Sequence, residues 1–485
     1  MDSQTAAGRR AVPDTSTSGR LKPNSLGVPG ILFLVLSAQA PLTGVAGAVP
    51  IAVAIGNGAG APAAYVAAGV VVLLFSVGFV AMSRHVVDAG AFYMYIGRGL
   101  GKMLGTGSAG VALFAYCAIQ AAMYGLYGAT VSALLAHHAG LDVPWWVCAA
   151  ATMAAVQALG ALGIEMGARV LTVLVLAEVG ILGVFTLVTL FAGGGPEGLG
   201  LAKSFSVGEA LQGAPGVALM FAVASMVGFE ATAIYGEEAR EPRRTVPRAT
   251  YLAVTLVTGF FALTSWMLVS SYGASKAPAA AARALQGGDS TSFVFAPIAD
   301  VFGAWVDDVL PVLLATSLFA GILAFHNAAG RYLFSLSRDG LLPRRLSAIN
   351  RRHSPGVAGG VQTAVAVLLV VPFALAGEDP VLTLFSWGSG VAVVGILLMY
   401  LLTSLSVIAF FHRERVDTRP WNTLVSPALG ALGITGAIWL VIENFTTLIG
   451  GERSTALWLG LTVPAVLALG AIASRLTHDR RAAVG

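Results

Sequence analysis

Two carboxylates lie inside apolar segments that are long enough to cross a membrane. Glu178 lies near the middle of residues 169–192, and Glu230 follows Gly228 by two positions within residues 213–235. An ionisable side chain at membrane depth is costly unless it faces the protein interior, so such residues mark ion or substrate paths. Both carboxylates are therefore candidates for coupling transport to a proton, with a structural role as the alternative for each.

Breaks in two apolar segments supply a second kind of candidate. Pro41 removes a backbone donor and clashes with the preceding turn, so we expect the first segment to break near residues 40–44. Gly228 permits non-helical backbone in the same way within residues 213–235. Irregular backbone at membrane depth is tolerated only inside protein or around a cavity. Corresponding breaks in two halves of a chain indicate a transporter with inverted repeats and a binding site at the breaks.

Other polar side chains fall at membrane depth. Gln120 needs a partner there, although the aromatic stripe around it favours packing. Thr316 and Ser317 are adjacent hydroxyls, which either bond back to their own helix or bind sodium if the first segment approaches them. Phe385 and Trp387 either cap an outer vestibule or belong to the interfacial aromatic belt.

Charged residues at the expected cytoplasmic ends suggest a gate. Glu237 follows the second break, Arg331 lies near the end of the eighth apolar segment, and Asp339 follows that segment. Salt bridges among these residues would close the inner side of a transport path. Solvated loop charges are the alternative, because exposed ion pairs contribute little.

The composition indicates a membrane protein. Of 485 residues, 56% are hydrophobic and 11% are charged, which is more apolar side chain than a soluble domain can bury. The seven histidines and two cysteines show no ligand-spaced metal motif, so we expect neither a metal site nor a cofactor. Without a nucleophile or acid–base pair near one surface, an enzyme is not expected. The basic residues lie in loops, so nucleic acid is not an expected partner.

Twelve apolar runs predict twelve transmembrane helices. They are residues 28–57, 62–82, 104–136, 145–164, 169–192, 213–235, 249–272, 306–336, 357–376, 380–411, 424–443 and 455–474. With a cytoplasmic N-terminus, 24 of the 28 Lys and Arg residues fall on the cytoplasmic side. The positive-inside rule therefore favours a multi-pass protein of the cytoplasmic (inner) membrane with both termini in the cytoplasm.

The same runs predict the domain organisation. Residues 1–26 are polar and are expected to form a disordered cytoplasmic tail. Residues 27–411 are predicted to form a ten-helix transport core, with one repeat at 27–192 and a second at 213–411. Residues 412–474 hold two peripheral helices, and residues 475–485 form a cytoplasmic C-terminal tail.

Three motifs resemble those of the amino acid–polyamine–organocation (APC) permeases. GFEATAIYGEEAREPRRTVPRA (Gly228–Ala249) resembles their span-six signature. AGAFYMYIGRGLG (Ala89–Gly101) is similar to their loop after span two, and NAAGRYLFSLSRDGLLP (Asn327–Pro343) to their span-eight ending. The resemblance implies a LeuT-like 5+5 inverted repeat with broken helices 1 and 6, plus two peripheral helices.

The resemblance also implies where a substrate binds. Backbone at Thr43, Gly44 and Val45 would hold a carboxylate, whereas carbonyls near Gln39, Ala40, Ala224 and Val227 would hold an amine. The implied substrate-binding set is Gln39, Ala40, Thr43, Gly44, Val45, Gln120, Ala224, Ser225, Val227 and Gly228. Glu178 aligns with a lysine that serves proton coupling in some relatives. Where relatives carry a glycine-rich run in span one, this chain has Leu42-Thr43-Gly44-Val45.

The function that the resemblance implies is secondary active transport of an amino acid by alternating access, with proton symport. Sodium-coupled symport and exchange of an amine or polyamine are the alternatives within transport. A non-transporting membrane sensor is the alternative of another class. The expected partners are a small-molecule substrate, a proton or sodium ion, and the lipid bilayer.

Overall fold

A computed structural model describes residues 26–86, 91–162, 168–234, 239–338, 340–350 and 354–482. Within these ranges the chain forms helices and no strands. Eleven segments of this described part are long and apolar enough to cross a membrane. The prediction of an all-helical, polytopic membrane protein is therefore confirmed.

The eleven segments coincide with eleven of the predicted runs. They are α1 (Val28–Gln39) continued by α2 (Pro41–Thr43), η2 (Gly44–Ala48), α3 (Val49–Ile51) and η3 (Ala52–Gly56); η4 (Gly58–Gly60) with α4 (Ala61–Ser83); α6 (Lys102–Ala139); α7 (Trp145–Leu162); α8 (Ala168–Phe191); α13 (Pro242–Tyr272); α16 (Trp305–Arg338); α17 (Gly356–Ala376); η7 (Pro380–Phe385) with α18 (Ser386–Glu414); η8 (Trp421–Val425) with α19 (Ser426–Glu443); and α21 (Arg453–Ala482).

The twelfth predicted run is divided. Residues 213–235 contain α11 (Pro215–Ala224), a series of turns, and α12 (Ala231–Ile234), so neither helical piece has spanning length. The count of twelve spans and the division into two inverted repeats stay predictions. Short helices occupy the connections: α5 (Ala91–Leu100), α9 (Leu201–Phe205), α10 (Val207–Ala210), α14 (Ala277–Gln286), α15 (Ser292–Phe302), η6 (Arg344–Ser347) and α20 (Phe445–Ile449).

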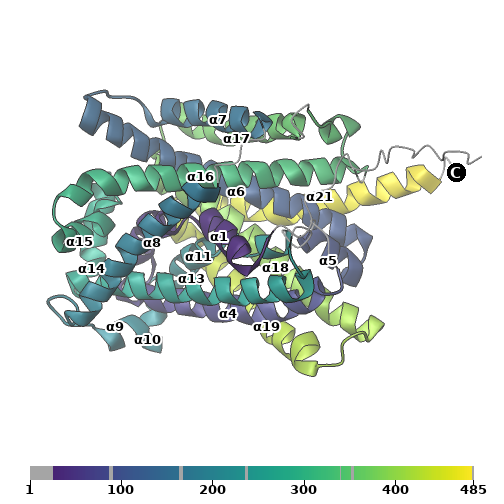
Figure 1. Cartoon of the computed structure of the whole chain (residues 1–485), viewed down its shortest axis with the longest axis horizontal. Coiled ribbons are helices and arrows are strands. Elements are labelled where there is room, and N and C mark those ends of the chain that lie inside the picture. Colours follow the sequence, from purple (N-terminus) through teal and green to yellow (C-terminus); the bar gives the residue numbers. More distant parts are fainter. Residues whose placement is uncertain are drawn as a thin grey trace, which may run out of the picture.

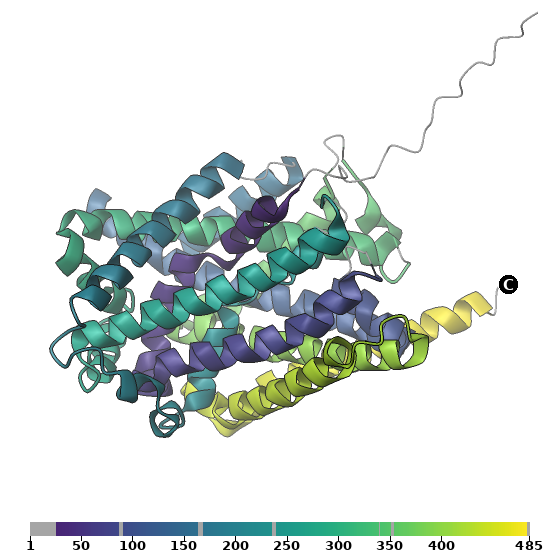
Figure 2. The same cartoon turned by 60° about the horizontal axis from the view of Figure 1, so that its bottom comes forward.

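The broken segments lie in the middle of the bundle. Figure 1 shows α1 and α11 surrounded by the long helices, and α1 contacts α8, α13 and α16. The helices α7 and α17 pack together along one edge, while α21 packs on α6 and extends past the other helices (Figures 1 and 2). Large apolar side chains such as Leu375 and Trp458 are exposed on these outer helices. An apolar outer face is what contact with lipid requires.

The first break is at Ala40. This residue has φ 46°, in the left-handed region that costs an L-residue about 1–2 kcal/mol,. Pro41 then begins the next helical piece, and the chain continues through the π-helical turns η2 and η3. The predicted break near residues 40–44 is confirmed.

The second break follows α11. The backbone leaves helical geometry after Ala224, and Gly228 has φ 114°, which glycine adopts without steric cost,. The chain re-enters a helix at Ala231. The break predicted from Gly228 is therefore confirmed as well.

Candidate functional site

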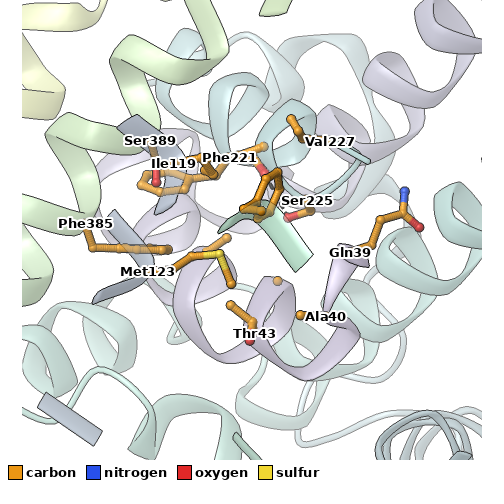
Figure 3. Close-up of a pocket in the computed structure, with 14 residues that line it drawn as sticks. Gln39, Ala40, Thr43, Ile119, Met123, Phe221, Ser225, Val227, Phe385 and Ser389 are labelled. Atoms are coloured by element: carbon orange, nitrogen blue, oxygen red, sulfur yellow. Dashed lines mark hydrogen bonds between the residues drawn. The ribbon is translucent and has the colours of Figure 1, made fainter. Parts of the chain in front are cut away.

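The two breaks meet at a small cavity in the centre of the bundle (Figure 3). The side-chain amide of Gln39, at the first break, donates to the carbonyl oxygen of Met226, at the second, over 3.1 Å. A Cβ atom on Gly44 would lie 3.3 Å from Ser225 Oγ, so the side chain of Ser225, at the second break, packs against the first break. The lining residues are Gln39, Ala40, Thr43, Gly44, Ala48, Ile119, Met123, Phe221, Ala224, Ser225, Val227, Phe325, Phe385 and Ser389.

The cavity is small in this conformation. Its volume is about 40 Å³. Because one water molecule needs roughly 10–15 Å³ by the same measure, the space holds about three waters. An amino acid requires more room, so the cavity must widen before a substrate of that size enters.

The polar groups of the lining include two atoms without partners. Gln39 Oε1 and Ser389 Oγ are buried and have no hydrogen-bond partner among the described residues. Buried polar atoms are almost always satisfied by protein, water or ligand. Ser225, by contrast, donates to Phe221 O over 2.9 Å within its own helix. Figure 3 shows the Gln39 amide directed away from the other lining residues, so of these two atoms only Ser389 Oγ is left as a candidate partner for whatever occupies the cavity.

Apart from Thr43, the rest of the lining is apolar, and none of the described lining residues has an ionisable side chain. Phe221 and Phe385 are stacked, with ring centroids 6.1 Å apart. Figure 3 shows Phe385 reaching toward Met123 from one side of the site. Of the two aromatic residues considered for an outer cap, Phe385 lines the cavity, whereas Trp387 donates to Ile449 O over 3.2 Å. The apolar lining suits a substrate side chain without charge.

Seven of the ten predicted binding residues line the cavity, namely Gln39, Ala40, Thr43, Gly44, Ala224, Ser225 and Val227. Three predicted residues, Val45, Gln120 and Gly228, do not. Gln120 instead donates to Ile322 O over 3.2 Å and accepts from Gln362 over 2.5 Å, which joins α6, α16 and α17. The predicted roles in holding substrate remain predictions for all ten.

The sequence reasoning missed seven lining residues: Ala48, Ile119, Met123, Phe221, Phe325, Phe385 and Ser389. All but Ser389 are apolar residues within long apolar stretches of sequence, where nothing local separates a lining residue from a packed one. Of these, only Phe385 was singled out, as one of two aromatic residues that could cap an outer vestibule.

The backbone amides at the first break already have partners. The amide of Leu42 donates to Glu178 over 3.2 Å, and the amide of Gly44 donates to Ala40 O over 3.1 Å. A substrate carboxylate at Gly44 would have to replace or share that internal bond.

Glu178 lies directly behind the first break. One of its carboxylate oxygens accepts from the Leu42 amide and, over 2.9 Å, from Ser317 Oγ. The side chain is 2% exposed. Thr43, which lines the cavity, lies with its hydroxyl 3.5 Å from that of Ser317. Two hydroxyl side chains, Thr43 and Ser317, thus lead from the cavity to Glu178.

The two adjacent hydroxyls of α16 have different surroundings. Thr316 donates to Leu313 O of its own helix over 2.9 Å, as back-bonding predicts,. Ser317 alone faces Glu178 and the first break. A sodium ion bound here would be held by Ser317 without Thr316 in this conformation.

Glu230 supports the second break from its buried side. Its carboxylate accepts from the Gly228 amide over 2.9 Å, from Tyr116 over 3.1 Å and from Tyr400 over 3.5 Å. It does not line the cavity. Because three donors from separate segments converge on it, Glu230 holds the turn at Gly228 against α6 and α18.

We expect Glu230→Gln to reduce uptake and lower thermal stability while leaving the protein in the membrane. The amide nitrogen would face one of the three donors, and a buried donor left unsatisfied costs about 1–3 kcal/mol. Uptake and the melting temperature of the purified protein would be measured together. Full activity with an unchanged melting temperature would show that these bonds are dispensable.

The predicted inner gate is only partly within the described residues. Arg331 lies on α16 and is partly exposed. Glu237 and Asp339 lie outside the described residues, so their pairing with Arg331 stays a prediction.

A family model matches this chain over nearly its whole length, and individual known proteins match about half of it. The sequence profile of the amino acid permease family matches residues 26–468. The branched-chain amino acid permease BcaP of Lactococcus lactis is 26% identical over 236 residues, which is 46% of this chain and 44% of that protein. The histidine permease of Saccharomyces cerevisiae is 25% identical over 291 residues, 56% of this chain and 46% of the yeast protein.

The match to each of these two relatives spans less than half of the relative's own length. The family profile, in contrast, covers both broken segments and all of the spanning helices except the last part of α21. Together with the apolar spanning helices, this match is consistent with the APC superfamily suggested by the three motifs. The chain belongs to the amino acid permease family.

Proposed function

We propose that this permease moves an amino acid with an uncharged, apolar side chain across the cytoplasmic membrane by alternating access. The observation that carries the proposal is the cavity at the two breaks, whose lining combines a few polar residues, Thr43, Ser225 and Ser389, with a mostly apolar wall. The polar atoms and the broken backbone suit the amino and carboxyl groups. Met123, Phe221 and Phe385 suit an apolar side chain.

The names of the two relatives agree with a small amino acid as substrate. One is called a branched-chain amino acid permease and the other a histidine permease. The apolar wall favours a branched-chain substrate over histidine, because an imidazole buried there would need hydrogen-bond partners.

We further propose proton symport with Glu178 as the coupling residue. Protonation converts a carboxylate oxygen from an acceptor into a donor. At Glu178 the change would remove an acceptor for the Leu42 amide or for Ser317, and so alter the first break. Glu230 is a weaker candidate, because its three donors all favour one fixed carboxylate.

Sodium symport is the second candidate. Oxygen atoms of Thr43, Ser317 and Glu178 already lie within hydrogen-bond distance along one chain. Hard cations prefer oxygen ligands of these kinds. A sodium ion would then take the place that the proton takes in the first candidate.

Uptake into proteoliposomes tests both parts of the proposal. A radiolabelled panel would contain leucine, isoleucine, valine, histidine, glutamate, lysine and putrescine, with an imposed proton gradient, a sodium gradient or neither. We expect accumulation of the branched-chain substrates with the proton gradient alone. Accumulation with sodium alone supports the second candidate, and preference for a charged substrate contradicts the apolar-substrate proposal. Absence of both uptake and counterflow would favour a sensor.

A further inference from the structure

Two histidines and a carboxylate meet at one end of the bundle, away from the cavity. His137 and His138 lie in the last turn of α6, and Asp308 lies in the first turn of α16. His137 Nε2 is 3.7 Å and His138 Nε2 is 3.9 Å from Asp308 Oδ1. The three ligand atoms all lie within 4.8 Å of one another.

We propose that His137, His138 and Asp308 form a binding site for a divalent transition metal, with Zn²⁺ as the best fit. Two imidazole nitrogens and one carboxylate oxygen are a ligand set that zinc accepts, with water in the fourth position. Imidazole also distinguishes the site from one for Mg²⁺ or Ca²⁺, which prefer oxygen ligands throughout.

The distances fit such a site after a small adjustment. Zinc binds these ligands at about 2.0–2.2 Å, so in a tetrahedral site the ligand atoms are roughly 3.3–3.5 Å apart. Two of the three separations exceed that range by less than about half an ångström. The side chains of His137, His138 and Asp308 are 74%, 46% and 64% exposed, so side-chain rotation can close the remaining gap,.

The three ligands come from the ends of two helices, so a bound metal ion would connect these helices. The last turn of α6 is fixed by Gly140, whose amide donates to Leu135 O. A bound ion would therefore tie a well-defined end of α6 to the start of α16. Both helices contribute to the cavity, α6 through Ile119 and Met123 and α16 through Phe325. A metal ion bound at this end would therefore connect two helices that line the cavity.

The alternative to a metal site is a surface ion pair between a protonated histidine and Asp308. Such a pair contributes little and binds no metal. A direct measurement of metal binding distinguishes the metal site from the ion pair, and it does not depend on transport activity.

The test is a calorimetric titration of ZnCl₂ into the full chain, solubilised in detergent and purified through a tag without histidine. We expect one Zn²⁺ per chain, and at least about tenfold weaker binding in Asp308→Asn and in His137→Ala, since each removes a ligand. Zinc should also raise the melting temperature of the wild type but not of Asp308→Asn, because a ligand that binds the folded state stabilises it.

Asp307→Asn is the matched control. This carboxylate is adjacent and exposed but does not belong to the cluster, so binding should be unchanged. The double variant His85→Ala/His412→Ala removes exposed histidines elsewhere and should also bind zinc normally. Equal affinity in the wild type and Asp308→Asn, or an equal loss in Asp307→Asn, would overturn the proposal. A melting temperature measured without zinc shows whether each variant is folded.

Discussion

Glu178→Gln is expected to abolish gradient-driven accumulation of substrate while leaving exchange across the membrane intact. Glutamine has nearly the same shape and keeps an oxygen that can accept from the Leu42 amide or Ser317. It cannot release or take up a proton. Accumulation should therefore fall to the level reached without a gradient, whereas counterflow needs only the binding site and the conformational change.

The two assays would be run on the same proteoliposomes. Thr316→Ala is the matched control, because its hydroxyl bonds to its own helix rather than to Glu178. It should behave as the wild type in both assays. Accumulation by Glu178→Gln at the wild-type level would exclude Glu178 as the coupling residue, and loss of counterflow as well would assign it a structural role.

Gly228→Leu is expected to eliminate substrate binding. Gly228 has φ 114°, and holding an L-residue in such a conformation costs about 1–3 kcal/mol,. Leucine also favours helix, so the turn between α11 and α12 would shift toward helical geometry. The Gly228 amide would then leave Glu230, and Val227, which lines the cavity, would be displaced.

Binding would be measured by scintillation proximity with the substrate identified in the uptake panel. Gly259→Leu serves as the control, since a Cβ atom there meets no atom within 4 Å and the residue lies within α13. The control should bind normally. Unchanged affinity in Gly228→Leu would contradict the role of the second break in binding, provided that the variant retains a cooperative thermal transition.

The fold was largely predictable because its main determinants are local. A run of apolar residues crosses the bilayer whatever surrounds it, and Pro41 and Gly228 alter the backbone through their own chemistry. Both breaks were therefore located from the sequence. Gly228 also explains why residues 213–235 form two short helices. The sequence did not predict that six non-helical residues would separate these helices.

The candidate site was only partly predictable. Polar residues beside the breaks, such as Thr43 and Ser225, were identified because the resemblance to the APC permeases implies a binding site at the breaks. Met123 and Phe325 were missed because each is one apolar residue in a long apolar helix. Gln120 was identified as polar at depth, but its partners, Ile322 and Gln362, come from other helices.

By itself, the sequence determined that this protein crosses a membrane many times, where two of its helices break, and that Glu178 and Glu230 lie at depth. These properties depend on hydrophobicity and on the conformational limits of single residues. Only the tertiary structure decided that Ser317 rather than Thr316 faces Glu178, and that Asp308 meets two histidines on another helix. Such choices depend on the rotation and packing of helices against one another, which join residues more than a hundred positions apart.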